Sequence, residues 1–305
     1  MALNSPLDGT SKHTAVMAYV EGLNLATQDW TQVYDVRRDD VGALKLSSVH
    51  ILDDIPEWDG NDNLDDTDHK KTLTDANSKA IEYQGYAVSC EIPILVQKDL
   101  PGIVQQVSRK LGQMVAYKYN ELAMSVFTNA FASETSGDGV ALIHDNHKGM
   151  TSGSVATDRD NNATAEILSR SAIFSALKLM DAYKSFSGQY LDFSNGPLTL
   201  IVDPTKREAA IEILASDFSG ADMETNAIKA GGFDISLIVS PYVNSDDWFV
   251  TTRQEGSKPL VFWERMEPTM QVLPGVTNLS LTLSTAFACK ASPKAEAAGI
   301  VGSAV

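Results

Sequence analysis

The chain has 305 residues, of which 43% are hydrophobic and 21% charged, and these values are ordinary for a globular protein. A chain of this length can form one large domain or two modest ones, each with its own core. The formal net charge of −16 argues against proteins that work by gripping nucleic acid, because such binding needs cationic groups that displace counterions.

Residues 1–36 have a mixed composition. The segment from Ala26 to Tyr34 predicts a short helix with Trp30 and Val33 on one face. The residues before it are small and polar, which is typical of an extended arm. We therefore expect an N-terminal arm that carries one short helix.

Residues 37–95 predict a long hairpin. Val41–Ile51 and Ala80–Ile94 have the alternation of strands. The stretch between them, DDIPEWDGNDNLDDTDHKKTLTD, is rich in carboxylates and is expected to be exposed. A hairpin this long is not stable by itself, so we expect support from outside the local chain.

Trp58 stands out within this acidic tip, beside Ile55 and Pro56. An aromatic side chain there would be exposed in a monomer, and such anchors mark docking points. The segment from Asp59 to Asp65 superficially resembles a calcium loop. The EF-hand pattern needs Gly at its sixth and Glu at its twelfth position, and those positions hold Leu and Lys here, so a solvated acidic surface is favoured.

Residues 99–132 carry the strongest periodic signal. Apolar residues recur at alternating steps near three and four, which predicts a long amphipathic helix. The stripe comprises Leu100, Ile103, Val104, Val107, Leu111, Met114, Val115, Leu122, Val126 and Phe127. At about 1.5 Å per residue this helix would reach roughly 45–50 Å, longer than a compact domain is wide, which suggests a spine.

The second half of the chain mixes helix and strand patterns. Residues 133–165 predict a polar surface loop in which only Val140–Ile143 could pair as a strand. Residues 166–252 then read as α/β. The expected helices lie at 165–186 and from 203 onward, and the expected strands at 197–202, 235–239 and 248–252.

Residues 258–290 return to β structure, punctuated by Pro and Gly. The expected short strands lie at 260–263, 269–273 and 279–289. The last fifteen residues, ASPKAEAAGIVGSAV, predict a loose tail.

His144-Asp145-Asn146-His147 is the place where metal ligands gather in the sequence. A zinc site needs three or four ligands, and no Cys or further His has a matching spacing, so a polar turn is favoured. The chain has neither a Gly-Lys-Ser/Thr motif nor a G-x-S-x-G elbow. We therefore expect no catalytic, cofactor or metal site.

The order of these elements resembles the major capsid proteins of tailed bacteriophages with the Hong Kong 97-type fold, most closely the Mu-like major head subunits. The hairpin lies where that family has its extended E-loop, and DLPGIVQQVSRKLGQMVAYKYNELAMSVFTNAF is similar to its spine helix. Three further stretches are similar to segments that follow the spine helix in that family, namely GDGVALIHDNH, ISLIVSPYVNSDDWFV and NLSLTLSTAFAC. The resemblance covers roughly residues 25–290 and rests on the ordered series, because no single motif is diagnostic.

The resemblance implies an α+β fold in five parts. These are an N-terminal arm (1–36), an E-loop hairpin (37–95), a peripheral P-domain with the spine helix and returning strands (96–159 and 258–290), an α/β axial A-domain (160–257) and a C-terminal tail (291–305). It also implies hexamers and pentamers of one chain, tiling an icosahedral shell around double-stranded DNA that is not bound by sequence. The implied further partners are a portal and cement or scaffolding proteins, with no membrane, and the implied location is the virion, assembled in the bacterial cytoplasm.

We expect the E-loop tip to lie on a neighbouring copy, where its carboxylates meet cations. The expected tip contacts are Ile55, Pro56, Trp58, Asp59, Asp62, Asp65, Asp66, Asp68, Lys70 and Lys71. The candidate basic partners are Arg37, Arg38, Arg109, Lys110 and Lys118. A single exposed ion pair contributes only about 0–1 kcal/mol, so many must act together.

Two alternatives stay open. One is an encapsulin-type nanocompartment shell, which shares the fold and houses an enzyme. The other is a metal-assisted hydrolase that uses His144, Asp145 and His147. The first sixteen residues have no basic region followed by an apolar one, so we do not expect secretion by a signal peptide. No apolar run reaches membrane-spanning length. Cys90 and Cys289 are expected to be reduced, although the sequence leaves open a disulfide between them.

Overall fold

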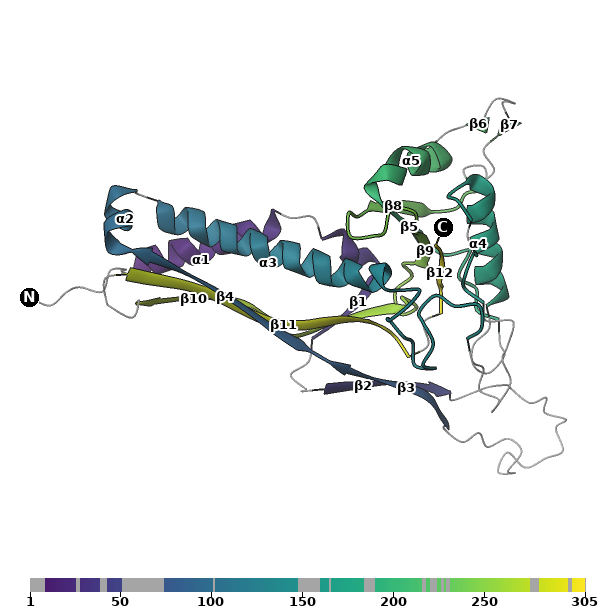
Figure 1. Ribbon diagram of the computed structural model, residues 1–305, viewed down its shortest axis with the longest axis horizontal. Helices are drawn as coiled ribbons and strands as arrows, with labels where there is room; N and C mark the ends of the chain where they lie inside the picture. The colour runs from purple at the N-terminus through teal and green to yellow at the C-terminus, as the bar shows by residue number, and fades with distance from the viewer. Residues whose placement is uncertain are drawn as a thin grey trace, which may run out of the picture.

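The computed structural model describes residues 9–25, 28–38, 43–50, 74–100, 102–147, 160–164, 166–183, 190–215, 218–219, 224–225, 228, 231–274, 280–295 and 298–304. These residues form two units, each built on a four-stranded sheet, and a separate two-stranded hairpin (Figure 1). A second, very short two-stranded pairing lies near residue 220.

The helices and strands follow one another along the chain in a mixed order. The helical segments are α1 (Gly9–Asn24), η1 (Asp29–Gln32), α2 (Ile94–Asp99), α3 (Ile103–Thr128), α4 (Arg170–Ala182), η4 (Pro204–Lys206) and α5 (Arg207–Ala215). The strands are β1 (Tyr34–Arg38), β2 (Ala43–His50), β3 (Thr74–Glu82), β4 (Gln84–Pro93), β5 (Leu198–Val202), β6 (Phe218–Ser219), β7 (Glu224–Thr225), β8 (Ile235–Val239), β9 (Trp248–Thr252), β10 (Leu260–Pro274), β11 (Ser280–Pro293) and β12 (Ile300–Ser303).

The first sheet has the strand order β1-β10-β11-β4. β11 runs antiparallel to both of its neighbours, β10 and β4, and β1 pairs with β10 in parallel. Figure 1 shows α3 lying along this sheet with α1 beside it. Buried aromatic rings fill the layer between them, namely those of Trp30, Tyr34, Tyr119, Phe262 and Phe287.

The predicted spine helix is confirmed as α3, which buries Leu111, Val115 and Val126. It begins later than expected, because Gly102 has a φ of 90° just before it and α2 forms a separate short helix. Its 26 residues span about 39 Å, less than expected. Met114 is 46% exposed, so it does not belong to the buried stripe.

The expectation of an extended N-terminal arm is wrong for the described residues. α1 packs on α3 with almost no space between the backbones. A Cβ added at Gly22 would lie 2.1 Å from the carbonyl oxygen of Arg109, and one at Gly112 would lie 2.2 Å from that of Tyr19. Two facing glycines thus let the helices touch, and α1 buries Ala15 and Tyr19 in return. The expected helix around Trp30 is only the short η1, because Tyr34 already begins β1.

β10 replaces two of the expected short strands. It runs unbroken from 260 to 274, with irregular register against β11 between Glu264 and Met266 and between Met266 and Thr269. Pro268 lies in this irregular stretch, where a residue without an N–H is tolerated. Pro268 therefore marks a bulge within one strand and does not end the strand.

The second unit confirms the expected α/β pattern. Its sheet has the order β12-β9-β5-β8, with α4 and α5 beside it (Figure 1). α4 begins after Ser169, whose hydroxyl accepts a hydrogen bond of 3.1 Å from the N–H of Ala172. The strand expected at 140–143 is only an isolated bridge between Thr135 and Ala141.

The expectation of a loose C-terminal tail is wrong for residues 300–303. These residues form β12, which pairs with β9, and Ile300 and Val301 are each 1% exposed. Gly299, with a φ of 83°, provides the turn that leads into the strand. Four residues are enough here because a strand at a sheet edge adds both backbone hydrogen bonds and apolar burial.

Both cysteines are free, and the geometry separates them. In the β11–β4 ladder Cys90 lies opposite Leu283, whereas Cys289 lies opposite Gln84. Six residues along a strand correspond to about 20 Å, which is beyond the reach of a disulfide. Within the described residues, no helix is both long and apolar enough for a membrane span.

Candidate functional site

A hairpin is present as the β2–β3 pair, which extends beyond the first sheet (Figure 1). The predicted second strand, 80–94, was wrong in its partner: β3 begins already at Thr74, and most of the predicted strand is β4, which pairs with β11 in the first sheet. The strands are antiparallel from Ala43 opposite Glu82 to His50 opposite Thr74. Residues 51–73, and with them all ten expected tip contacts, lie outside the described residues. The described part of the site is therefore the base of the hairpin and the candidate basic partners.

Side chains from several elements hold the base of the hairpin. Ile81 on β3 is 2% exposed and packs with the buried Val261 and Trp263 of β10. The Tyr83 ring meets Trp263 edge-on at 6.0 Å and carries the Arg265 guanidinium 4.1 Å above its centre. These contacts fix the direction in which the hairpin leaves the sheet.

Lys79 ties the same strand to the loop that follows α3. Its ammonium donates a hydrogen bond to the Thr135 carbonyl. Burial lowers the pKa of Lys79, against the opposing attraction of Glu134. This partly buried cation bonds one carbonyl and so adds direction to the apolar anchor at Ile81. The base of the hairpin is therefore held by both apolar and polar contacts.

The first two candidate basic partners already form ion pairs within the chain. Arg37 bonds Asp35 at 3.1 Å. Arg38, which is 68% exposed, bonds Glu264 at 2.9 Å and Glu267 at 3.0 Å. Glu264 is the buried member of this group, and it raises the pKa of the Arg38 guanidinium.

Two of the three candidate partners on α3 also form ion pairs within the chain. Arg109 bonds Glu21 of α1 at 2.7 Å, and Lys118 bonds Glu121 at 2.6 Å. Lys110 is exposed and forms no ion pair with the rest of the described chain. All of these pairs are exposed on at least one side, so each contributes little and can be exchanged for another carboxylate.

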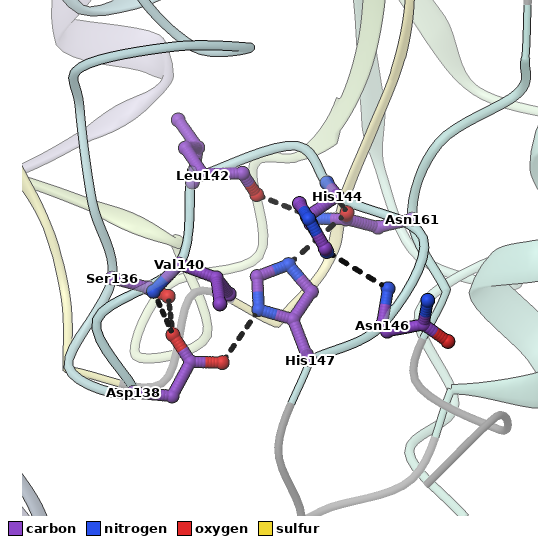
Figure 2. Close-up of polar contacts among 8 residues, drawn as sticks. All are labelled: Ser136, Asp138, Val140, Leu142, His144, Asn146, His147 and Asn161. Carbon is purple, nitrogen blue, oxygen red and sulfur yellow. Dashed lines mark hydrogen bonds and ion pairs between the residues drawn. The ribbon is translucent and has the colours of Figure 1, made fainter. Parts of the chain in front are cut away.

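The predicted polar turn at 144–147 is in fact part of a buried hydrogen-bonded cluster (Figure 2). His147 is 2% and Asn161 0% exposed. His147 Nδ1 lies 2.8 Å from Asp138 Oδ2, and its Nε2 lies 3.2 Å from Asn161 Oδ1. Asp138 also accepts hydrogen bonds from the Ser136 hydroxyl and from the Val140 N–H.

The pKa of Asp138 reflects these partners. Burial would raise it, but the hydrogen bonds from His147 and Ser136 and the charge of His147 lower the pKa to about 2. The carboxylate is therefore ionised at all ordinary pH values. A buried anion of this kind needs a matching donor set, which the cluster supplies.

The cluster does not have the form of a metal or hydrolytic centre. Among the described residues, no three His, Cys, Asp or Glu side chains are placed to hold a metal ion. His144 and His147 point to different partners, and Asp145 accepts a hydrogen bond of 2.7 Å from the Asn162 side chain. The ring nitrogens of His147 are both engaged, so neither is free to act as a general base.

The sequence reading missed the members that complete this cluster. Asp138 and Asn161 come from a polar loop that looked exposed, and Asn161 lies against β12. The Asn161 carbonyl accepts from the Gly302 N–H at 3.1 Å. A signal was nevertheless present, since the loop holds Asp and Asn residues on both sides of the two histidines.

Comparison with protein families gives one clear match. The model described as phage capsid protein matches residues 85–301, more than two thirds of the chain. No curated protein sequence matches at a significant level.

Several solved structures share the fold at low sequence identity. The virus-like particle from Pyrococcus furiosus has a TM-score of 0.56 at 12% identity, covering 96% of this chain and 98% of that one. The capsid of cyanophage P-SCSP1u gives 0.57 at 11%, covering 91% and 88%. The mature capsid of bacteriophage PhiM1 gives 0.56 at 11%, covering 91% and 87%.

Proposed function

Since this chain belongs to the phage capsid protein family, we propose that its projecting hairpin joins each copy to its neighbour in the shell. The family and the fold make it a major capsid protein of the Hong Kong 97-type, a component of an icosahedral shell and not an enzyme. The metal-assisted hydrolase considered above is thereby excluded.

The proposal assigns the parts of the fold to roles in assembly. Residues 37–95 are the E-loop, 96–159 with 258–290 the P-domain, and 160–257 the A-domain. β12 pairs with β9 of the second sheet, so we add residues 300–303 to the A-domain. Within the family, we place this chain nearest the Mu-like head subunits, on the ordered motifs of its sequence.

The observation that carries the proposal is the contrast between the two ends of the hairpin. Its base is fixed by Ile81, Tyr83 and Lys79, so the direction of the hairpin is set by the subunit itself. Its tip carries an apolar anchor, Trp58, among carboxylates. A fixed base with an acidic, aromatic tip suits an arm that delivers its tip to one place on another copy.

The basic residues of the receiving copy support this exchange. Arg37, Arg109 and Lys118 hold partly or fully exposed carboxylates of their own chain, and Lys110 is exposed. Arg38 would keep its bond to the buried Glu264 and could exchange only the exposed Glu267. Replacing one weak surface pair by another costs little, and many such exchanges per shell add up. These residues thus offer a ready set of partners for the acidic tip.

The wider partners follow from the same assignment. Copies form hexamers and pentamers around double-stranded DNA, whose backbone an acidic protein repels and so leaves unbound. A portal and cement or scaffolding proteins complete the particle, and assembly takes place in the bacterial cytoplasm.

The test is deletion of Ile55–Lys71, with a short Gly-Ser link that keeps β2 and β3 connected. The expected result is a folded monomer with unchanged thermal unfolding that forms no particles in sedimentation and electron microscopy. The matched control is Lys178→Gln, which changes an exposed lysine of α4 outside the hairpin and its candidate partners and should still assemble. Shells of normal size from the deletion would refute the role of the hairpin.

One alternative keeps the fold and changes the cargo. The similarity to a virus-like particle from Pyrococcus furiosus makes an encapsulin-type compartment the second candidate. The contents of particles purified from the native source distinguish the two, because a phage head holds double-stranded DNA and a compartment holds protein.

A further inference from the structure

A group of basic side chains surrounds Trp263 on the face of the first sheet that α3 does not cover. Phe262 packs in the main core beneath α3, whereas Trp263 packs on the other face with Ile81 of the hairpin base. In the sheet register Trp263 lies opposite Arg37 of β1 and opposite Lys290 of β11. Directly opposed residues share one face of a sheet, so both cations flank Trp263 on the uncovered side.

Two more cations join them from the base of the hairpin. The Arg265 guanidinium lies 4.1 Å above the centre of the Tyr83 ring. Lys79 of β3 lies close enough to Lys290 that the charge of Lys290 adds to burial in lowering the pKa of Lys79. The group thus continues from the sheet onto the first part of the hairpin.

Lys294, which directly follows β11, completes the group. Its ammonium bonds Asp35 at 3.2 Å, and the same carboxylate bonds Arg37 at 3.1 Å. Five side chains from three strands and their continuations therefore gather here. We call them the basic patch, which comprises Arg37, Lys79, Arg265, Lys290 and Lys294.

The basic patch holds more cations than carboxylates, in a protein whose formal net charge is −16. Two of its members share the single carboxylate of Asp35, and Glu134 attracts Lys79. Within the part of the chain that the structure describes, Lys290 and Arg265 have no carboxylate at ion-pair distance. An acidic partner laid on the patch would offset the repulsion among these cations.

We infer that the basic patch receives the acidic stretch 53–68 from the hairpin of a second copy. The inference rests on the proposed function and names the surface that receives the tip. This stretch carries eight carboxylates and no basic residue, which complements the patch. Extended, its sixteen residues span up to about 50 Å, so it can also reach the basic residues of α3.

The direction of the hairpin favours a second copy over the chain's own tip. From Lys79, β3 leads back to Thr74, which is about 17 Å along the strand, and the hairpin extends beyond the sheet in this direction (Figure 1). Double-stranded DNA is the less favoured partner, because the acidic protein as a whole repels its backbone.

The first experiment identifies the contact without any substitution. Full-length chains labelled with ¹⁴N and with ¹⁵N are mixed, assembled into particles and treated with a carbodiimide, which joins carboxylates directly to lysines. Mass spectrometry should find links of mixed isotope between the stretch 53–68 and Lys290 or Lys294. The absence of such links would overturn the inference. Mixed links to Lys110 or Lys118 alone would do so while leaving the proposed function standing, and links within single copies alone would overturn both.

The second experiment reverses one charge of the patch. Lys290→Glu should leave thermal unfolding unchanged and lower the yield of particles by about tenfold, because every copy repeats the lost contact. The matched control Lys178→Glu, at an exposed lysine of α4, should assemble like the wild type. Adding Asp62→Lys and Asp65→Lys to Lys290→Glu should restore part of the yield.

Two results of this experiment would contradict the inference. One is a normal yield of particles from Lys290→Glu. The other is particles in normal number that hold less DNA, which would identify DNA as the partner of the patch. If Lys290→Glu does not fold, the cross-links of the unaltered chain decide alone.

Discussion

The two sheets differ in how completely the chain covers them. Every residue of β5 and of β9 in the second sheet is buried. In the first sheet β11 alternates between buried and partly exposed residues, and the edge strand β4 is mostly exposed or partly exposed. The central strands of the second sheet are thus covered on both faces within one copy, and only its edge strand β8 is partly exposed. The first sheet has one covered face and one open face.

This difference indicates where neighbours are needed. Strands buried on both faces gain their stability from one chain, as in α/β domains generally. A sheet with one open face and an open edge leaves surface that another copy can cover. The fixed base of the hairpin lies on this first unit, so the incomplete part of the subunit is also the part that reaches out.

The largest effect on the stability of the monomer should come from replacing Trp248 in the second sheet. Trp248 on β9 is 0% exposed, and its Nε1 donates to the Glu166 carbonyl at 2.8 Å. Trp248→Ala should lower the free energy of unfolding of the monomer by about 3–5 kcal/mol, because it leaves a cavity in a closed core. Urea unfolding of the unassembled chain gives the value.

Trp58→Ala is the counterpart in the hairpin tip. It should change monomer stability by less than about 0.5 kcal/mol and yet reduce particle formation. If Trp58→Ala and Trp248→Ala destabilised the monomer equally, the hairpin of the first unit would be as closed as the core of the second sheet, and the comparison would fail.

The contact of α1 with α3 should be the next most sensitive place. Gly112→Ala puts a Cβ 2.2 Å from the Tyr19 carbonyl oxygen, so α1 must move away. We expect a loss of about 3 kcal/mol, as for overpacking of a tight core. Gly85→Ala on β4 is the matched control, since nothing lies within 4 Å of the added Cβ, and urea unfolding should show almost no change for it.

These glycines also show what a single sequence reveals. Periodicity predicted α3, α4, β5, β8, β9 and β11, because a long apolar stripe or an apolar run indicates a buried face. It was wrong for β10, which joins two expected strands, and for the strand expected at 140–143. α1 and β12 were missed for another reason. A helix that packs through Gly22 and Ala15 has almost no apolar stripe, and a four-residue strand is identified only by the sheet that receives it.

The polar cluster was missed for a third reason. The composition of a loop rich in Asp, Asn and His predicts a surface position, whereas His147 and Asn161 are buried, and Asn161 bonds Gly302 of β12. The residues of the hairpin tip, by contrast, were chosen by charge and by one aromatic side chain. Of the basic residues proposed as their partners, all except Lys110 form ion pairs with other described residues, namely Asp35, Glu264, Glu267, Glu21 and Glu121.

The join between the two units should respond to acid. Asp138 has its pKa lowered to about 2 from an unfolded value near 3.9. Its contribution is fully present above the unfolded value and is lost as pH falls toward 2, which amounts to about 2 kcal/mol. Comparing urea unfolding at pH 5 and at pH 2.5 should show this loss in the wild type. Asp138→Asn should already lack it at pH 5, and the same slope in both proteins would contradict the assignment.

The smallest effect on the monomer should come from the surface charges of the open unit. Arg109→Gln removes the pair with Glu21, which is exposed by 44% on the arginine side and 59% on the glutamate side, so the monomer should lose less than about 1 kcal/mol. Particles should react more strongly, because each one repeats the contact many times. Wild-type assembly should weaken as salt brings the Debye length below about 8 Å, and the variant should depend less steeply on salt. Light scattering at a series of ionic strengths measures both. Identical salt dependence would mean that Arg109 meets no acidic tip, and the open face would then have to be covered by apolar contacts such as those of Trp58.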